Sequence, residues 1–136
     1  MKALSVRAPW WWAILHLGKD IENRDWSTNF RGTIYLHAGK FWKDAEIKEG
    51  VDDISFIMGD AVLEVFCSED TLWYGRGCIV GTVDIVGCVS QSKSRWFSGE
   101  YGFQLANPVA FPRPIPFKGA LGFFDVPDNF LRKLKG

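Results

Sequence analysis

The sequence contains few of the residues that bind metals or form disulfide frameworks. Its 136 residues include three cysteines and two histidines. The cysteines, Cys67, Cys78 and Cys88, are odd in number and lack the close paired spacing of a zinc site. We therefore expect reduced thiols, and the sequence indicates neither a metal nor another cofactor.

Long apolar runs are also missing. No stretch approaches the ~20 apolar residues that a membrane-spanning helix requires. The first residues reach Pro9 too soon to resemble a signal peptide. We therefore expect a cytoplasmic protein with no membrane partner.

The chain has no excess charge of either sign, because 16 Lys and Arg residues balance 16 Asp and Glu residues. Such a chain is not a polycation that binds nucleic acid by bulk attraction alone. The charges are uneven, however: residues 1–50 carry 8 basic and 6 acidic side chains, residues 51–92 carry 1 and 7, and residues 93–136 carry 7 and 3. If the two basic ends meet in space, they form one positive surface suited to nucleic acid, away from the acidic middle.

Apolar and aromatic residues are plentiful, at 47% and 15% of the chain, which suits one domain over residues 1–136. Alternating patterns predict strands at 2–6, 33–38, 77–89, 101–105 and 119–126, and Gly81 and Gly87 suggest bends or close backbone approach. A proline-rich extended connection is expected between the last two strands. The predicted fold is α+β, a small β-barrel with flanking helices.

The remaining segments are expected to be helices and loops. A first helix lies between Pro9 and Gly18, and a short last one begins near Pro127. Residues 39–58 are a helical or irregular insertion, 61–66 are a strand or the tail of that helix, and 68–70 are a solvated loop. On the first helix, the buried stripe is expected to contain Trp10, Ala13, Ile14 and Leu17, with Trp12 and His16 opposite it.

Residues 18–26, with the sequence GKDIENRDW, combine both signs of charge with an aromatic ring. In a strand, Glu22, Arg24 and Trp26 share one face, and Ile21, Asn23 and Asp25 share the other. Neither face is apolar. A strand of this kind belongs at a solvated edge or in the wall of a polar cleft.

Three side chains of this segment are candidates for chemistry. Lys19 follows a helix-ending glycine, so its ammonium can reach a phosphate or a developing oxyanion. Glu22 is a candidate general base, or an acceptor for a base amino group, which makes Lys19 and Glu22 the candidate catalytic residues. Arg24 would hold Glu22 or a phosphate. The alternative is a purely structural ion pair between Glu22 and Arg24.

Aromatic rings close to basic side chains suit single-stranded or flipped bases. The candidates for stacking are Trp11, Trp26, Trp96 and Tyr101, and ordinary packing is the alternative for each. We expect His37 on the outward face of its strand with Tyr35, as an acid, a base or a hydrogen-bonded structural residue.

Further polar candidates lie elsewhere in the chain. Glu100 is a candidate carboxylate on the opposite wall of the cleft. Arg31 and Lys40 are candidate phosphate contacts, and solvated loop positions explain them equally well.

The chain resembles the ASCH family in the segments LSVRAPWWWAIL, GKDIENRDW, NFRGTIYLHAG, GEYGFQL and PFKGALGFFDVP. The most specific feature is the pattern G-K-x-x-E-x-R, here Gly18, Lys19, Glu22 and Arg24, followed by an R-G pair and a strand. The resemblance implies a PUA-like β-pseudobarrel with a cleft near the first helix and the following strand. It also implies RNA or a modified nucleoside as the partner.

Members of this family are associated with nucleic-acid binding, RNA cleavage or hydrolysis of an acyl group from a modified cytidine. In the amidohydrolase branch a threonine follows the motif lysine by three residues, and Glu22 stands there in this chain. Relatives often have Gln and Ala where this chain has Ala8 and Trp11. The leading hypothesis is therefore binding of RNA or a modified nucleobase.

Two alternatives stay open. One is a hydrolase, either a metal-independent ribonuclease or a modified-cytidine amidohydrolase that uses the same cleft. The other is a protein-interaction module that uses the surplus tryptophans, Trp11 or Trp12. The sequence indicates no oligomeric state.

Overall fold

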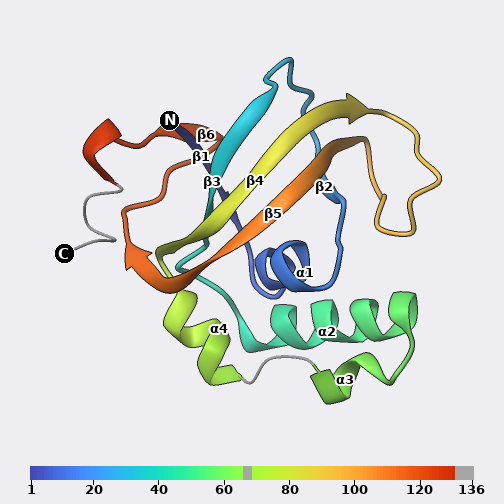
Figure 1. Cartoon of the computed structure of the whole chain (residues 1–136). Coiled ribbons are helices and arrows are strands. Elements are labelled where there is room, and N and C mark those ends of the chain that lie inside the picture. The colour runs from blue at the N-terminus through green and yellow to red at the C-terminus, as the bar shows by residue number, and fades with distance from the viewer. Residues whose placement is uncertain (66–68, 131–136) are drawn as a thin grey trace.

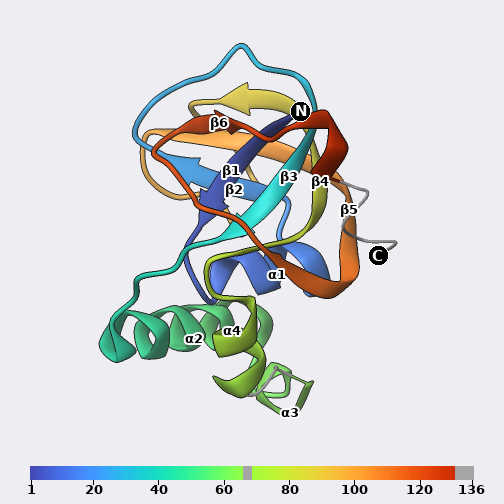
Figure 2. The ribbon, with the colours of Figure 1, turned by 90° about the vertical axis from the view of Figure 1, so that its left-hand side faces the viewer.

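A computed structural model describes residues 1–65 and 69–130 (Figure 1). The strands form one sheet, in the order β2-β5-β4-β3-β1-β6. Their bounds are Lys2–Val6 for β1, Ile21–Arg24 for β2, Gly32–Ala38 for β3, Cys78–Val89 for β4, Tyr101–Pro116 for β5 and Phe123–Asp125 for β6. The helices are Trp10–His16 for α1, Asp44–Met58 for α2, Val62–Val65 for α3 and Glu69–Gly75 for α4. The sheet curls into a half-barrel with helices at one end, which confirms the α+β barrel-like fold (Figures 1 and 2).

The curl of the sheet depends on close approach between β4 and β5. Their pairing shifts register at three places along the strands. A side chain at Gly81 would place its Cβ 2.2 Å from the carbonyl oxygen of Val109, so only glycine fits there. At Gly87 the Cβ would meet the side chain of Gln104. Both glycines therefore permit close approach, as the sequence predicted.

The strand β3 is buried on both faces, which corrects one expectation. Ile34 and Leu36 face the main core, together with residues of β1, β4 and α1. Tyr35 and His37, expected to face outward, are buried as well. The reason is that the end of β5 and the segment after β6 cover the second face, where Phe130 packs on Tyr35 with ring centroids 5.1 Å apart.

More faces of the helix α1 are buried than the single apolar face that the sequence predicted. Ala13 and Ile14 are buried and His16 is exposed, as expected. Trp12, however, is also buried, whereas Trp10 is only partly buried. Glycines of two other helices explain the cover: a Cβ at Gly50 of α2 would touch Pro9, and one at Gly75 of α4 would touch Trp11. Figure 2 shows α2 and α4 beneath α1.

Several expected connections differ from the structure. Residues 101–116 form one long strand, so Pro108, Pro112 and Pro114 lie within β5 and not in a connection. The strand β2 pairs only with residues 101–104 of β5, which leaves the later part of β5 as an edge where missing N–H groups are tolerated.

The expected loop over 68–70 is also corrected. Glu69 and Asp70 begin α4, while Ser68 lies outside the described residues. For residues 61–66 the helical alternative holds over 62–65, and Phe66 is not among the described residues.

The last strand is shorter than expected, because β6 spans only Phe123–Asp125. The expected C-terminal helix corresponds to one turn, in which the Phe130 amide donates to the carbonyl of Pro127 at 3.0 Å, and 131–136 fall outside the described range. In the described part of the chain, no helix is both long and apolar enough to cross a membrane.

Candidate nucleic-acid interface

A cleft of about 1430 Å³ opens between α2, the strands β1 to β3, the β4–β5 connection and the segment that follows β5. It is lined by seven basic side chains, Arg7, Lys19, Arg24, Lys40, Arg76, Arg95 and Lys118. The acidic side chains in its lining are Glu22 and Asp53, so the formal charge of the lining is 7 − 2 = +5. Six of the seven cations come from the two basic ends of the sequence. The ends therefore meet at one positive surface, as their charge pattern suggested.

Lys19 lies at the floor of this cleft and is 4% exposed. The chain reverses at Gly18, whose φ of +73° suits glycine, and the Lys19 amide donates to the carbonyl of Ala13 at 3.2 Å. Its Nζ donates to the carbonyl of Ile21 and lies 3.6 Å from Oε1 of Glu22. Burial lowers the pKa of Lys19, and the charge of Glu22 opposes that shift.

Glu22 stands between two cations. Its Oε2 accepts hydrogen bonds from Nη2 of Arg24 at 2.8 Å and from Nε of Arg24 at 3.2 Å. Arg24 Nη2 also donates to the carbonyl of Ser5 at 2.7 Å. Ser5 belongs to β1, which is separated from β2 by three strands in the sheet order, so the curl brings the two strands together. Glu22 and Arg24 therefore form an ion pair with each other and also line the cleft.

His37 extends this network from β1 to β3 and is 1% exposed. Its Nε2 lies 2.7 Å from the carbonyl oxygen of Phe117, and its Nδ1 lies 3.0 Å from Oγ of Ser5. Because a carbonyl only accepts, Nε2 carries a hydrogen, and in the neutral imidazole Nδ1 accepts from the Ser5 hydroxyl. Burial lowers the pKa of His37, opposed by hydrogen bonds to the Phe117 and Gly77 backbone. Burial thus favours the neutral imidazole of His37.

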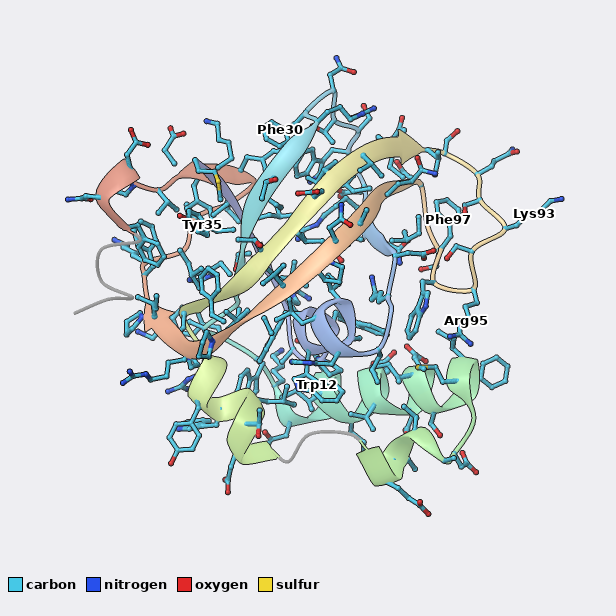
Figure 3. The ribbon with its side chains drawn as sticks, viewed as in Figure 1. Trp12, Phe30, Tyr35, Lys93, Arg95 and Phe97 are labelled. Atoms are coloured by element: carbon cyan, nitrogen blue, oxygen red, sulfur yellow. The ribbon has the colours of Figure 1, made fainter. Side chains whose placement is uncertain are left out.

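The β4–β5 connection supplies an aromatic wall. Asn23 of β2 holds this connection, because its Nδ2 donates to the Trp96 carbonyl and its Oδ1 accepts from the Ser98 amide, both at 2.9 Å. Trp96 and Phe97 line the cleft beside the guanidinium of Arg95, whose Cζ lies 5.6 Å from the Trp96 ring centroid. Figure 3 shows Arg95 and Phe97 projecting from this connection.

The chain was compared with known families and proteins. The model of the ASCH domain family matches residues 4–115. The chain belongs to the ASCH family. It is also similar to activating signal cointegrator 1 from Mus musculus and from Homo sapiens, at 28% identity over 125 residues in each case. Each match covers 85% of this chain and 20% of the relative, so the chain spans about a fifth of the length of these relatives.

The cleft of this ASCH domain brings together about half of the residues that the sequence suggested. They are Lys19, Glu22, Arg24, His37, Lys40 and Trp96. All three charged residues of the G-K-x-x-E-x-R pattern are among them. Glu22, which stands where the amidohydrolase branch has a threonine, therefore lies at the centre of the charge network.

The other suggested residues lie outside the cleft lining. Trp11 is 4% exposed and belongs to the core. Trp26 follows the end of β2, and its ring packs edge-on against Phe103 with centroids 5.1 Å apart. Arg31 donates to the carbonyls of its own turn. Glu100 is exposed and Tyr101 is half-buried, and neither lines the cleft.

Some lining residues carried no signal of their own in the sequence. Arg7, Arg76, Arg95 and Lys118 come from four separate segments, and only the basic character of the two ends pointed toward most of them. Trp10 was assigned to the buried stripe of α1, but it lines the cleft, with Lys19 Nζ 5.6 Å from its ring centroid.

One alternative use of the ASCH domain, as a protein-interaction module that uses Trp11 or Trp12, loses support. Trp11 and Trp12 are both buried, so they offer no surface for capturing a protein. Within residues 1–65 and 69–130, no three His, Cys, Asp or Glu side chains gather as a metal ion would require.

Proposed function

We propose that this ASCH domain binds single-stranded RNA or a modified nucleobase in the cleft. The observation that carries the proposal is the excess of five positive charges in a cleft that also contains aromatic rings. Phosphates provide the complementary charge, and unpaired bases provide faces that pack on aromatic rings. The general association of ASCH domains with RNA supports the same partner.

The side chains that line the cleft fall into two groups, exposed cations and a partly buried, hydrogen-bonded network. Lys40 and Lys118 are exposed, so their ammonium groups can contact phosphates, whose oxygens need no fixed geometry from an ammonium group. The network of Glu22 and Arg24 is held in place by its own hydrogen bonds, so it suits the edge of a base. Trp96 and Phe97 form an apolar wall beside it.

The proposal is tested by fluorescence anisotropy with a labelled single-stranded RNA of ten nucleotides. The double variant Lys40→Ala/Lys118→Ala removes two cations of the cleft. The control variant Lys43→Ala/Lys93→Ala removes two exposed cations that lie outside the lining, and Lys93 points away from the molecule in Figure 3. The cleft variant should bind about tenfold more weakly, with the control close to wild type. Absence of binding by wild type, or equal loss in both variants, would contradict the proposal.

A second function, hydrolysis at Lys19 and Glu22, is favoured by one observation. Burial lowers the pKa of Lys19, and its ammonium lies against a carboxylate in the cleft. Lys19 would stabilise developing oxyanion charge and Glu22 would act as general base. Incubation with RNA and with an acylated cytidine, in the presence of a chelator, separates this function from binding. If turnover by wild type does not exceed turnover by Glu22→Gln, hydrolysis at this site is ruled out and binding is the remaining function.

A further inference from the structure

A cluster of two tryptophans and one arginine lies beside the cleft, formed by Trp42, Trp73 and Arg76. The Arg76 Cζ lies 3.7 Å from the ring centroid of Trp73 and 5.9 Å from that of Trp42. The two indole rings meet edge to face, with centroids 5.8 Å apart. A separation of 3.7 Å means that the guanidinium is stacked on Trp73, so its position is fixed by the ring.

Among the described residues, no acidic side chain pairs with this arginine, although Arg76 lines the cleft. Trp73 is 53% exposed, although large aromatic side chains are usually well buried. A fixed cation and an exposed indole therefore lie together at the surface, where both are accessible to a ligand.

The cluster lies at the C-terminal end of α4, where Arg76 is its member that lines the cleft and Trp42 and Trp73 lie beside it. Figure 1 shows α4 and the β4–β5 connection on opposite sides of the molecule. Both regions nevertheless contribute lining residues to the same cleft. Its volume of about 1430 Å³ exceeds the roughly 300–1,000 Å³ of pockets for a single small ligand. The cleft is therefore large enough in volume for more than one nucleotide.

We propose that Trp42, Trp73 and Arg76 form a second nucleotide subsite. One base of a single strand stacks on the exposed indole of Trp73 or on the free face of the Arg76 guanidinium. The neighbouring phosphate contacts Arg76 and Lys40, which both line the cleft. Another nucleotide of the same strand lies at the Lys19, Glu22 and Arg24 network.

This inference rests on the proposed function and names its ligand more narrowly, as a single-stranded oligonucleotide. A free nucleoside fills only one of the two subsites. A duplex keeps its bases stacked on one another, so they are not available to an indole ring. The positive charge of the lining argues for this occupant over an apolar peptide.

The test measures binding of three probes: cytidine monophosphate, a labelled single-stranded RNA of ten nucleotides, and its duplex. The variants are Trp73→Ala, which removes the stacking face, and Arg76→Lys, which keeps the charge but loses the planar group. Tyr74→Ala is the matched control, because Tyr74 follows Trp73 on α4 and is 75% exposed, but it is not part of the cluster of Trp42, Trp73 and Arg76. Arg76→Lys also provides an independent readout if Trp73→Ala fails to fold.

Wild type should bind the single strand more tightly than either other probe. Trp73→Ala and Arg76→Lys should each weaken binding of the ten-nucleotide strand by about tenfold, while Tyr74→Ala and all affinities for the mononucleotide stay unchanged. Wild-type affinity of both variants for the strand would overturn the second subsite alone. Equal weakening for strand and mononucleotide would also overturn it. Absence of RNA binding by wild type would overturn both the proposed function and the subsite.

Discussion

Arg24 lies two residues after Glu22 on β2 and donates two hydrogen bonds to one oxygen of its carboxylate, Oε2, at 2.8 and 3.2 Å. The other carboxylate oxygen, Oε1, lies 3.6 Å from Nζ of Lys19. One buried acid therefore compensates two cations. The floor of the cleft keeps a net positive charge, and its geometry is fixed before any ligand binds.

The variant Glu22→Gln should destabilise the fold by about 3 kcal/mol, because it leaves the buried ammonium of Lys19 without its counter-charge. Asp125→Asn provides the control, since it breaks the surface pair in which Lys2 Nζ lies 2.8 Å from Asp125. That exposed pair should contribute less than about 1 kcal/mol. Urea unfolding of both variants measures the difference, and equal losses would show that the network is not held by its buried charges.

Stability should depend on the protonation of His37. Burial lowers the pKa of His37 from its usual value of 6.5, so in mildly acidic solution the unfolded chain binds a proton that the folded chain does not. The stability is therefore complete above about pH 6.5 and falls as the pH decreases toward the pKa of the folded state.

The other histidine, His16, is exposed, but partial desolvation also lowers its pKa, so the measurement uses the variant His16→Gln. NMR titration of this variant follows a single imidazole, and unfolding at several pH values gives the stability. A His37 pKa at or above 6.5, or stability that is flat down to pH 5, would contradict the assignment of a neutral imidazole.

The two glycines of β4 should differ in their tolerance of alanine. Gly81→Ala forces a Cβ to within 2.2 Å of the backbone carbonyl of Val109, which cannot move without breaking the strand pairing. We expect a loss of about 3 kcal/mol. Gly87→Ala meets only the side chain of Gln104, which can rotate away, so it should cost less than about 1 kcal/mol. Thermal unfolding that ranks the two variants in the opposite order would contradict this account of the curl.

The sequence predicted the elements that depend on local pattern. Alternation placed β1 and β3, and Gly18 marked the end of α1. Of the charged residues in 18–26, Glu22 and Arg24 lie on the short strand β2 and line the cleft, which is one of the two placements that the sequence left open. Trp26 departs from that pattern because β2 ends at Arg24, so the period of two no longer applies to it.

Other features depend on contacts between distant segments and had no local signal. The hydrogen bond from Arg24 to Ser5 forms only because the sheet curls, and no pattern in either strand indicates it. The burial of Trp11 depends on α4, which follows much later in the chain and brings Gly75 against its ring. Arg76 is the single basic residue of the acidic middle segment, and it reaches the cleft because α4 ends there.

The central claim is that cations of the cleft bind the phosphates of single-stranded RNA. The most direct measurement is the affinity of wild type and of Lys40→Ala/Lys118→Ala for a ten-nucleotide strand as the salt concentration is raised. The logarithm of the wild-type association constant should fall linearly with the logarithm of salt, by about 0.7 per phosphate contact, and the variant should show a slope shallower by about 1.4. Binding that does not depend on salt, or identical slopes for the two proteins, would contradict the claim.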